Sequence, residues 1–313
     1  MRVGIMIEGQ EGLTWERWLR LAQAAEDLGY ESLCRSDHLT GLAGQSRRPS
    51  LETWTSLTAL ATRTRRIRFG PLVSPLTFYH PALLAKMATA VDELSGGRFD
   101  LGIGAGWNEY EHAMFGLPFA SLKERLDRLE CGARLIRALG AGQPVTLEQK
   151  YYPLRKAESH PVPPHGRLRL VIGGRGERRT LRIVAAFADE WNVTRVDVGG
   201  FRQKRQVLAE HCRAVGRDPE TITRSLMVPL ALGADSADVA QRIGAARAIF
   251  PVLPEDERGW RAAGFLAGSP EAVAQDLRRW AEAGTERVLL QILDQEDIAA
   301  LELFARTVMP ALA

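Results

Sequence analysis

An Asp-His pair is the residue pattern of this chain best suited to proton transfer. Asp37 and His38 stand in the segment CRSDHLTG, directly after a short apolar run. A carboxylate beside an imidazole can hold one tautomer of the ring, which then donates or accepts a proton near neutral pH. A structural role is equally compatible, in which Asp37 caps a loop and His38 packs beneath it. The pair alone leaves both alternatives open.

Glycine recurs at every second position in the segment DLGIGAGWNEYEHAMFG. Gly102, Gly104 and Gly106 would share one face of a strand, where glycine gives up packing and costs backbone entropy. Such a row indicates that another group, either a ligand or a facing strand, approaches the backbone closely. Trp107 and Asn108 follow the row and would stand at the end of that strand.

A second glycine-rich stretch, VIGGRGERRTLRIV, runs directly from an apolar segment into a helical pattern. Gly173, Gly174 and Gly176 leave backbone N–H groups accessible at the helix start. Arg175 adds a positive charge, and the combination is typical of an anion site. The spacing matches neither the phosphate loop of nucleotide-hydrolysing enzymes nor the dinucleotide fingerprint. An ordinary tight turn is the alternative, and the arginine favours phosphate.

Other chemistries lack the residues that they need. The histidines and the three cysteines do not have the spacing of a zinc site, so we expect no bound metal. No serine stands between glycines in the manner of a hydrolase nucleophile. An anion loop with few acid–base groups is typical of a cofactor enzyme, in which the cofactor carries the chemistry and the protein orients it.

The elements that must position these residues alternate along the whole chain. Near-continuous apolar runs predict strands buried on both faces at 3–7, 32–35, 67–73, 99–105, 168–172, 191–194, 226–232 and 288–293. Helix starts are expected at Thr14, Pro81, Ser121 and Ser269. Eight strands in this alternation favour a single (β/α)8 TIM barrel over residues 1–313, with a doubly wound open sheet as the alternative.

Two stretches depart from the regular alternation. Residues 140–166 are too long for a turn and predict an inserted hairpin and loop between the fourth helix and the fifth strand. We expect this insertion to cover or border the active site and to hold the substrate beneath it. Prolines at positions 71, 75 and 81 predict a bulge or tight bend at the end of the third strand.

Composition bounds the class of protein. Of the 313 residues 45% are apolar and 25% are charged, and the formal net charge is +3, which is ordinary for a globular protein. Because the sequence has no basic run with interleaved aromatic residues and no apolar run of about 18 residues, we expect neither nucleic-acid binding nor a membrane span. Three cysteines far apart in the chain suit reduced thiols, so a cytoplasmic location is expected.

The motifs together resemble the luciferase-like monooxygenase superfamily, and within it the coenzyme F420-dependent oxidoreductases. The matching segments follow one another in the family's order over nearly the whole chain: LAQAAEDLGYESLCRSDHL, HPALLAKMATAVDELSGGRFDLGIGAGWNEYEHAMFG, VIGGRGERRTLRIVAAFADEWNV and GSPEAVAQDLRRWAEAGTERVLLQI. The resemblance implies a (β/α)8 barrel with a deazaflavin or flavin at its C-terminal mouth. Coenzyme F420 is the expected cofactor and FMN is the alternative.

The resemblance also implies roles for individual residues. His38 would assist hydride transfer at the reactive edge of the ring, with Asp37 beside it. A non-proline cis peptide at Leu72-Val73 would back the ring. The ring and its ribityl chain would be lined by Gly104, Gly106, Trp107 and Asn108. The phosphate would be bound by Gly173, Gly174, Arg175 and Gly176.

Two positions depart from the family pattern. Tyr79 stands where many relatives have arginine, and Trp107 stands where sugar-phosphate dehydrogenases of this branch carry a carboxylate proton donor. Glu109 and Glu111 are nearby but shifted, so that activity is not carried over to this chain. Three hypotheses remain open: a hydride transfer with coenzyme F420 to or from a small organic substrate, an FMN-dependent monooxygenase, and a flavin-binding protein without turnover. The family resemblance also implies a homodimer, while the substrate is left undetermined.

Overall fold

The computed structural model describes residues 1–42 and 47–312 and forms a closed barrel of parallel strands. The strands follow the order β3-β2-β1-β12-β10-β9-β8-β5-β4. Their bounds are β1 Arg2–Ile7, β2 Ser32–Arg35, β3 Arg68–Pro71, β4 Ser74–Pro75, β5 Asp100–Gly104, β8 Arg169–Gly173, β9 Glu190–Thr194, β10 Thr223–Leu232 and β12 Arg287–Ile292. A parallel bridge between Phe69 and Phe99 closes the sheet. The expected barrel is confirmed, and the open sheet is wrong.

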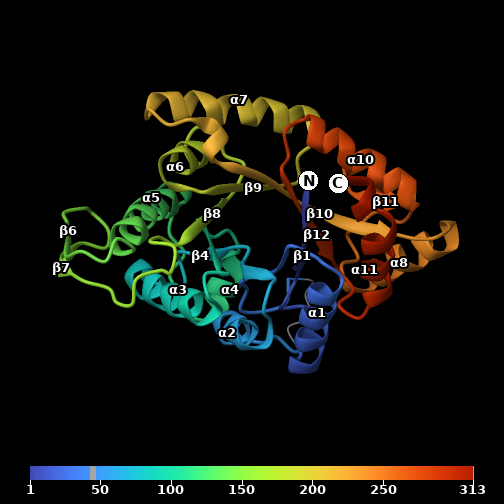
Figure 1. The fold of residues 1–313 in the computed structure, drawn as a ribbon, viewed down its shortest axis with the longest axis horizontal. Helices are drawn as coiled ribbons and strands as arrows, with labels where there is room; N and C mark the ends of the chain where they lie inside the picture. Colours follow the sequence, from blue (N-terminus) through green and yellow to red (C-terminus); the bar gives the residue numbers. More distant parts are fainter. Residues whose placement is uncertain (43–46, 313) are drawn as a thin grey trace.

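Helices surround the sheet on its outer side (Figure 1). The longer ones are α1 Trp15–Asp27, α2 Thr53–Arg63, α3 Pro81–Ser95, α5 Leu122–Leu139, α6 Thr180–Phe187, α7 Val198–Ala214, α8 Ser236–Ile249, α10 Pro270–Glu282 and α11 Ile298–Thr307. The expected starts are confirmed, since the side chains of Thr14 and Ser121 accept backbone N–H groups of α1 and α5. Gly96 ends α3 with a φ of 71°. Within the described ranges, no helix is long and apolar enough to cross a membrane.

The third strand is broken, as its prolines indicated. β3 ends at Pro71, a cis peptide joins Leu72 to Val73, and β4 begins at Ser74. The Leu72 N–H still donates to the carbonyl of Arg35 on β2 at 2.8 Å. The chain at the break therefore remains hydrogen-bonded to β2. The expected position of the cis peptide is confirmed.

The insertion forms the expected hairpin, but it does not cover the mouth of the barrel. β6 (Val145–Leu147) and β7 (Leu154–Ala157) pair antiparallel, and Figure 1 shows them outside α3 and α5. Lys86 of α3 donates a hydrogen bond to a backbone carbonyl of the insertion. Only the hairpin tip comes near the start of α3, where Tyr152 packs edge-on against His80 with ring centroids 5.1 Å apart. The insertion thus packs on the outer surface of α3 and α5, with its hairpin tip bordering the start of α3.

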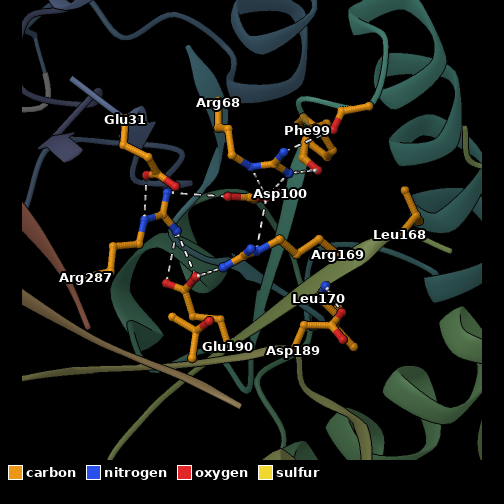
Figure 2. Close-up of polar contacts among 12 residues, drawn as sticks. Glu31, Arg68, Phe99, Asp100, Leu168, Arg169, Leu170, Asp189, Glu190 and Arg287 are labelled. Atoms are coloured by element: carbon orange, nitrogen blue, oxygen red, sulfur yellow. Dashed lines mark hydrogen bonds and ion pairs between the residues drawn. The ribbon is translucent and has the colours of Figure 1, made fainter. Parts of the chain in front are cut away.

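Six charged side chains of alternating sign close the N-terminal end of the barrel (Figure 2). They are Glu31, Arg68, Asp100, Arg169, Glu190 and Arg287. Five are the first residue of their strand, and Glu31 directly precedes β2. The Arg287 side chain is 1% exposed and has three acidic partners, two of them at 2.9 Å. Three arginines balance three acids, which satisfies the pairing that burial of charge requires.

The C-terminal end of β10 extends beyond its neighbours and carries an additional layer. β10 pairs with β11 (Leu266–Gly268), and α8 and α9 (Glu257–Ala262) pack there around the fully buried Trp260. Sequence analysis expected β10 only as a barrel strand. The short helix α4 (Glu109–Met114) follows β5, which is separated from β10 by β8 and β9.

Candidate active site

The glycine row of β5 faces the break in the third strand. A Cβ atom at Gly102 would stand 2.0 Å from the carbonyl oxygen of Pro71, and one at Gly104 would stand 2.7 Å from a methyl group of Val73. Gly173 on β8 would meet the same valine at 3.2 Å. Val73 packs with the side chains inside the barrel. The third strand is therefore one close neighbour that the glycine row admits.

We expect Gly102→Ala to destabilise the fold more than Gly104→Ala does. The added methyl group would collide with a backbone carbonyl in the first variant and with a side chain in the second, and only the side chain can rotate away. Overpacking of this kind costs about 1–3 kcal/mol, and we place Gly102→Ala at the upper end. Urea denaturation measures both variants.

Gly199→Ala is the matched control for these two variants. Gly199 is exposed in the first turn of α7, and its added methyl group would lie 3.6 Å from the Oδ1 atom of Asp197, an ordinary contact. Alanine is the better helix former, so this variant should unfold at the same urea concentration or a higher one. Equal stability of Gly102→Ala and the control would show that β5 can move away from the third strand.

Glu111 of α4 is the carboxylate that contacts His38. The Nδ1 atom of His38 lies 2.9 and 3.1 Å from the two carboxylate oxygens of Glu111. One of these oxygens also accepts the backbone N–H of Leu39 at 3.0 Å. The Glu111 side chain is 2% exposed and that of His38 is 14% exposed. Because Nδ1 donates to the carboxylate, Nε2 is the nitrogen that remains for a substrate.

The surroundings of His38 favour its cationic form. Burial lowers the pKa of His38, but the hydrogen bond and charge of Glu111, together with the charges of Glu8 and Asp37, outweigh burial and raise the pKa. A raised pKa in the folded state means that this contact stabilises the fold below the unfolded pKa of about 6.5. That contribution is lost as the pH rises through the raised pKa.

Asp37 contacts the third strand and not the imidazole of His38. Its buried carboxylate accepts hydrogen bonds from the hydroxyl of Ser74 at 2.5 Å and from that of Tyr79 at 3.2 Å. Burial raises the pKa of Asp37, against the opposing effects of the Ser74 hydrogen bond and the Arg35 charge. The interpretation of Asp37 as the partner that orients His38 is wrong, because its carboxylate bonds to Ser74 and Tyr79 while the Nδ1 atom of His38 contacts Glu111.

Trp107 stands beside His38, and Asn108 follows it at the start of α4. The Trp107 ring meets the His38 ring edge-on with centroids 5.7 Å apart, and it is 65% exposed. Gly106 has a φ of 76° and turns the chain into α4, where Asn108 is the N-terminal cap residue. The carbonyl of Asn108 lies 2.6 Å from the Nδ1 atom of His112. These contacts fix the segment that brings Glu111 over the mouth.

The glycine-rich loop after β8 wraps around the first residue of α6. A Cβ atom at Gly174 or at Gly176 would come within 2.9 Å of the Thr180 side chain. Gly174 also has a φ of 140°, which favours glycine. The exposed Arg175 donates to the carbonyl of Arg195 at 3.2 Å. The loop therefore places positive charge next to the start of α6, where the N-cap residue Arg179 makes no side-chain capping bond.

Glu8 is a second carboxylate of the mouth, and sequence analysis missed it. It directly follows β1, is 8% exposed, and accepts a hydrogen bond from Gln10 at 2.8 Å and another from Gln291 of β12. Its position after a strand was an available signal, since barrel enzymes place polar groups there. Glu111 offered a weaker signal, because it stands seven positions after Gly104, the last residue of β5.

The described residues contain no group of metal ligands, and the thiol of Cys34, inside the barrel, is unreactive. Over residues 1–42 and 47–312, no three His, Cys, Asp or Glu side chains are grouped so that they could hold a metal ion. Burial raises the pKa of the Cys34 thiol to about 12, and the charges of Asp100 and Glu190 act in the same direction. The Cys34 thiol is therefore protonated in the folded protein and a poor nucleophile.

A family model described as luciferase-like monooxygenase matches residues 1–287. The chain belongs to this family. A luciferase-like relative, the F420-dependent hydroxymycolic acid dehydrogenase of Mycobacterium tuberculosis, is 28% identical over 239 residues, which cover 75% of this chain and 64% of that protein. The chain spans about half to two thirds of the length of the first curated relatives that it matches.

Solved structures of the luciferase-like fold superpose over the whole chain. An F420-dependent secondary alcohol dehydrogenase, solved with an F420-acetone adduct, has a TM-score of 0.83 and 19% identity and is covered to 99%. The monooxygenase RslO1 from Streptomyces bottropensis has a TM-score of 0.85 and 21% identity and is covered to 100%. At these identities the likeness establishes the fold alone.

Proposed function

We propose that this chain is an oxidoreductase that transfers a hydride between coenzyme F420 and a small organic substrate at the C-terminal mouth of the barrel. The observation that carries the proposal is the buried His38–Glu111 contact, which holds a titratable imidazole at that mouth. The F420-dependent name of the relative with 28% identity supports the choice of cofactor. FMN with a monooxygenase reaction is the second candidate, supported by the monooxygenase that shares the fold.

The residues at the mouth fit a deazaflavin or a flavin. The loop of Gly173, Gly174, Arg175 and Gly176 offers positive charge and an accessible helix start to a phosphate. The exposed Trp107 ring offers an aromatic surface to a flat ligand. A bound deazaflavin supplies the carbon that gives or accepts the hydride.

The chain's own residues have distinct roles in this proposal. His38 holds or releases a proton at Nε2, next to the reacting substrate. Leu72 and Val73 support the ring from the third strand, and Asp37 fixes that support through its hydrogen bond with Ser74. Gly104, Gly106, Trp107 and Asn108 would line the ring and its ribityl chain.

Separate titrations of the ligand-free protein with coenzyme F420 and with FMN test the proposal. Cofactor fluorescence should show saturable binding of coenzyme F420, with FMN binding at least about tenfold more weakly, a difference of 1.4 kcal/mol. The opposite preference would favour the monooxygenase, and oxygen consumption would then be the next measurement. Absence of binding by either cofactor would overturn both the anion-loop assignment and the proposed function.

A further inference from the structure

We propose that Glu111 is the positioning residue of the active site, which holds the His38 ring so that Nε2 faces the substrate, and that the neighbouring Asp37 has no such role. The catalytic role of this contact rests on the proposed function. The contact itself stands on the geometry of the ligand-free protein. The motif that draws attention to Asp37 and His38 therefore contains only one of the two residues of the acid–base unit.

The Glu111 carboxylate restrains both the ring and the backbone of His38. Both oxygens approach Nδ1, at 2.9 and 3.1 Å, and the second oxygen also accepts the N–H of Leu39 at 3.0 Å. With the Glu111 side chain 2% exposed, water has little access to compete for these bonds. Rotation of the ring would break two contacts to one buried carboxylate, so the orientation of His38 depends on Glu111.

The helix that carries Glu111 is itself fixed in place. The next residue, His112, is fully buried between the rings of Phe78 and Phe119, each with its centroid 4.8 Å away. Its Nδ1 contacts the carbonyl of Asn108 at the start of α4. His112 thus anchors α4 from below, and Glu111 extends from this anchored turn to His38.

This arrangement determines what His38 can do. With Nδ1–H donated to Glu111, the neutral ring presents a lone pair at Nε2 and the cationic ring presents an N–H there. In the reduction of a carbonyl group, the hydride from the reduced deazaflavin forms the C–H bond while the carbonyl π electrons move to oxygen. That oxygen takes the Nε2 proton, which leaves neutral His38 and an alcohol.

The charges that face His38 favour its role as proton donor. Glu111 from α4, Glu8 after β1 and Asp37 after β2 are all acidic, and each stabilises the imidazolium form. A cationic ring with Nε2–H suits the reduction of a carbonyl compound, because the oxygen of that substrate must gain a proton.

The decisive measurement is the titration of His38 by NMR in the cofactor-free protein. Glu111→Gln removes the charge while keeping the side-chain shape, so the His38 titration should move to lower pH. Glu109→Gln is the matched control, since it removes an exposed charge from the same helix and should leave the titration unchanged. Glu111→Asp keeps the carboxylate, so the pKa of His38 should stay partly raised. This variant preserves the test if Glu111→Gln does not fold.

A second readout connects the contact to catalysis. With coenzyme F420 bound, Glu111→Gln should lower the rate about 10–100-fold, by analogy with the loss of the hydrogen-bond partner of a metal-bound histidine. The pH dependence of the rate should move in the same direction as the His38 titration. Equal titration in Glu111→Gln and Glu109→Gln would overturn the proposal. A shifted titration in a protein that binds no cofactor would uphold the contact and overturn the proposed function instead.

Discussion

Replacing Arg287 by methionine is expected to lower the free energy of unfolding by about 3–5 kcal/mol. Arg287 is 1% exposed and contacts Glu31, Asp100 and Glu190 at the N-terminal end of the barrel. Its removal leaves the buried carboxylates of Asp100 and Glu190, and the partly buried one of Glu31, with one cation fewer. Burial lowers the pKa of the arginine, but these three acids outweigh burial and raise it well above its usual value, so the guanidinium remains charged.

Arg182→Met is the matched control for this variant. Arg182 pairs with Glu130 at 2.8 Å, but its side chain is 51% exposed. Exposed pairs of this kind contribute about 0–1 kcal/mol, so the control should unfold close to the unchanged protein in urea. The double variant Arg287→Met/Glu190→Gln should lose less than the sum of its single changes, since it removes a charge of each sign. Similar losses in Arg287→Met and Arg182→Met would contradict a stabilising role of the charged cluster.

Replacing His38 by asparagine is expected to slow hydride transfer about 10²–10⁴-fold, the range that a positioned acid–base group contributes. Asparagine keeps a hydrogen-bonding group near Glu111 but cannot exchange a proton at the Nε2 position. The affinity for coenzyme F420 should change little, because the proposed phosphate loop follows β8, whereas His38 follows β2. Single-turnover absorbance of the reduced cofactor, mixed with a panel of ketones and aldehydes, measures the rate.

The same variant separates an enzyme from a protein that only binds the cofactor. A binding protein would hold coenzyme F420 equally well with and without His38 and would show no substrate-dependent oxidation in either form. His165→Asn is the control, since His165 is exposed in the insertion on the outer surface of the barrel. An unchanged rate of hydride transfer in His38→Asn would show that the Nε2 atom of His38 does not take part in the reaction.

Signals that are local in the chain predicted much of the fold. The hydrophobic runs identified the barrel strands because both faces of a parallel sheet are buried, and β2 has the expected bounds, Ser32–Arg35. Thr14 and Ser121 marked helix starts because their side chains bond to N–H groups only a few residues away. The family motifs located the cis peptide after Pro71, the loop around Arg175 and the position of His38 at the mouth.

The sequence by itself thus determined the alternation of strands and helices, the family and the places of His38 and Arg175. Only the tertiary structure decided which groups meet. His38 and Glu111 are 73 residues apart, and the charged cluster of Arg287 draws on six separate segments. The neighbour of the β5 glycines, Val73, and the outward packing of the insertion also follow from the closed barrel. Local backbone preferences act over a few residues, whereas contacts between distant side chains exist only once the sheet has closed.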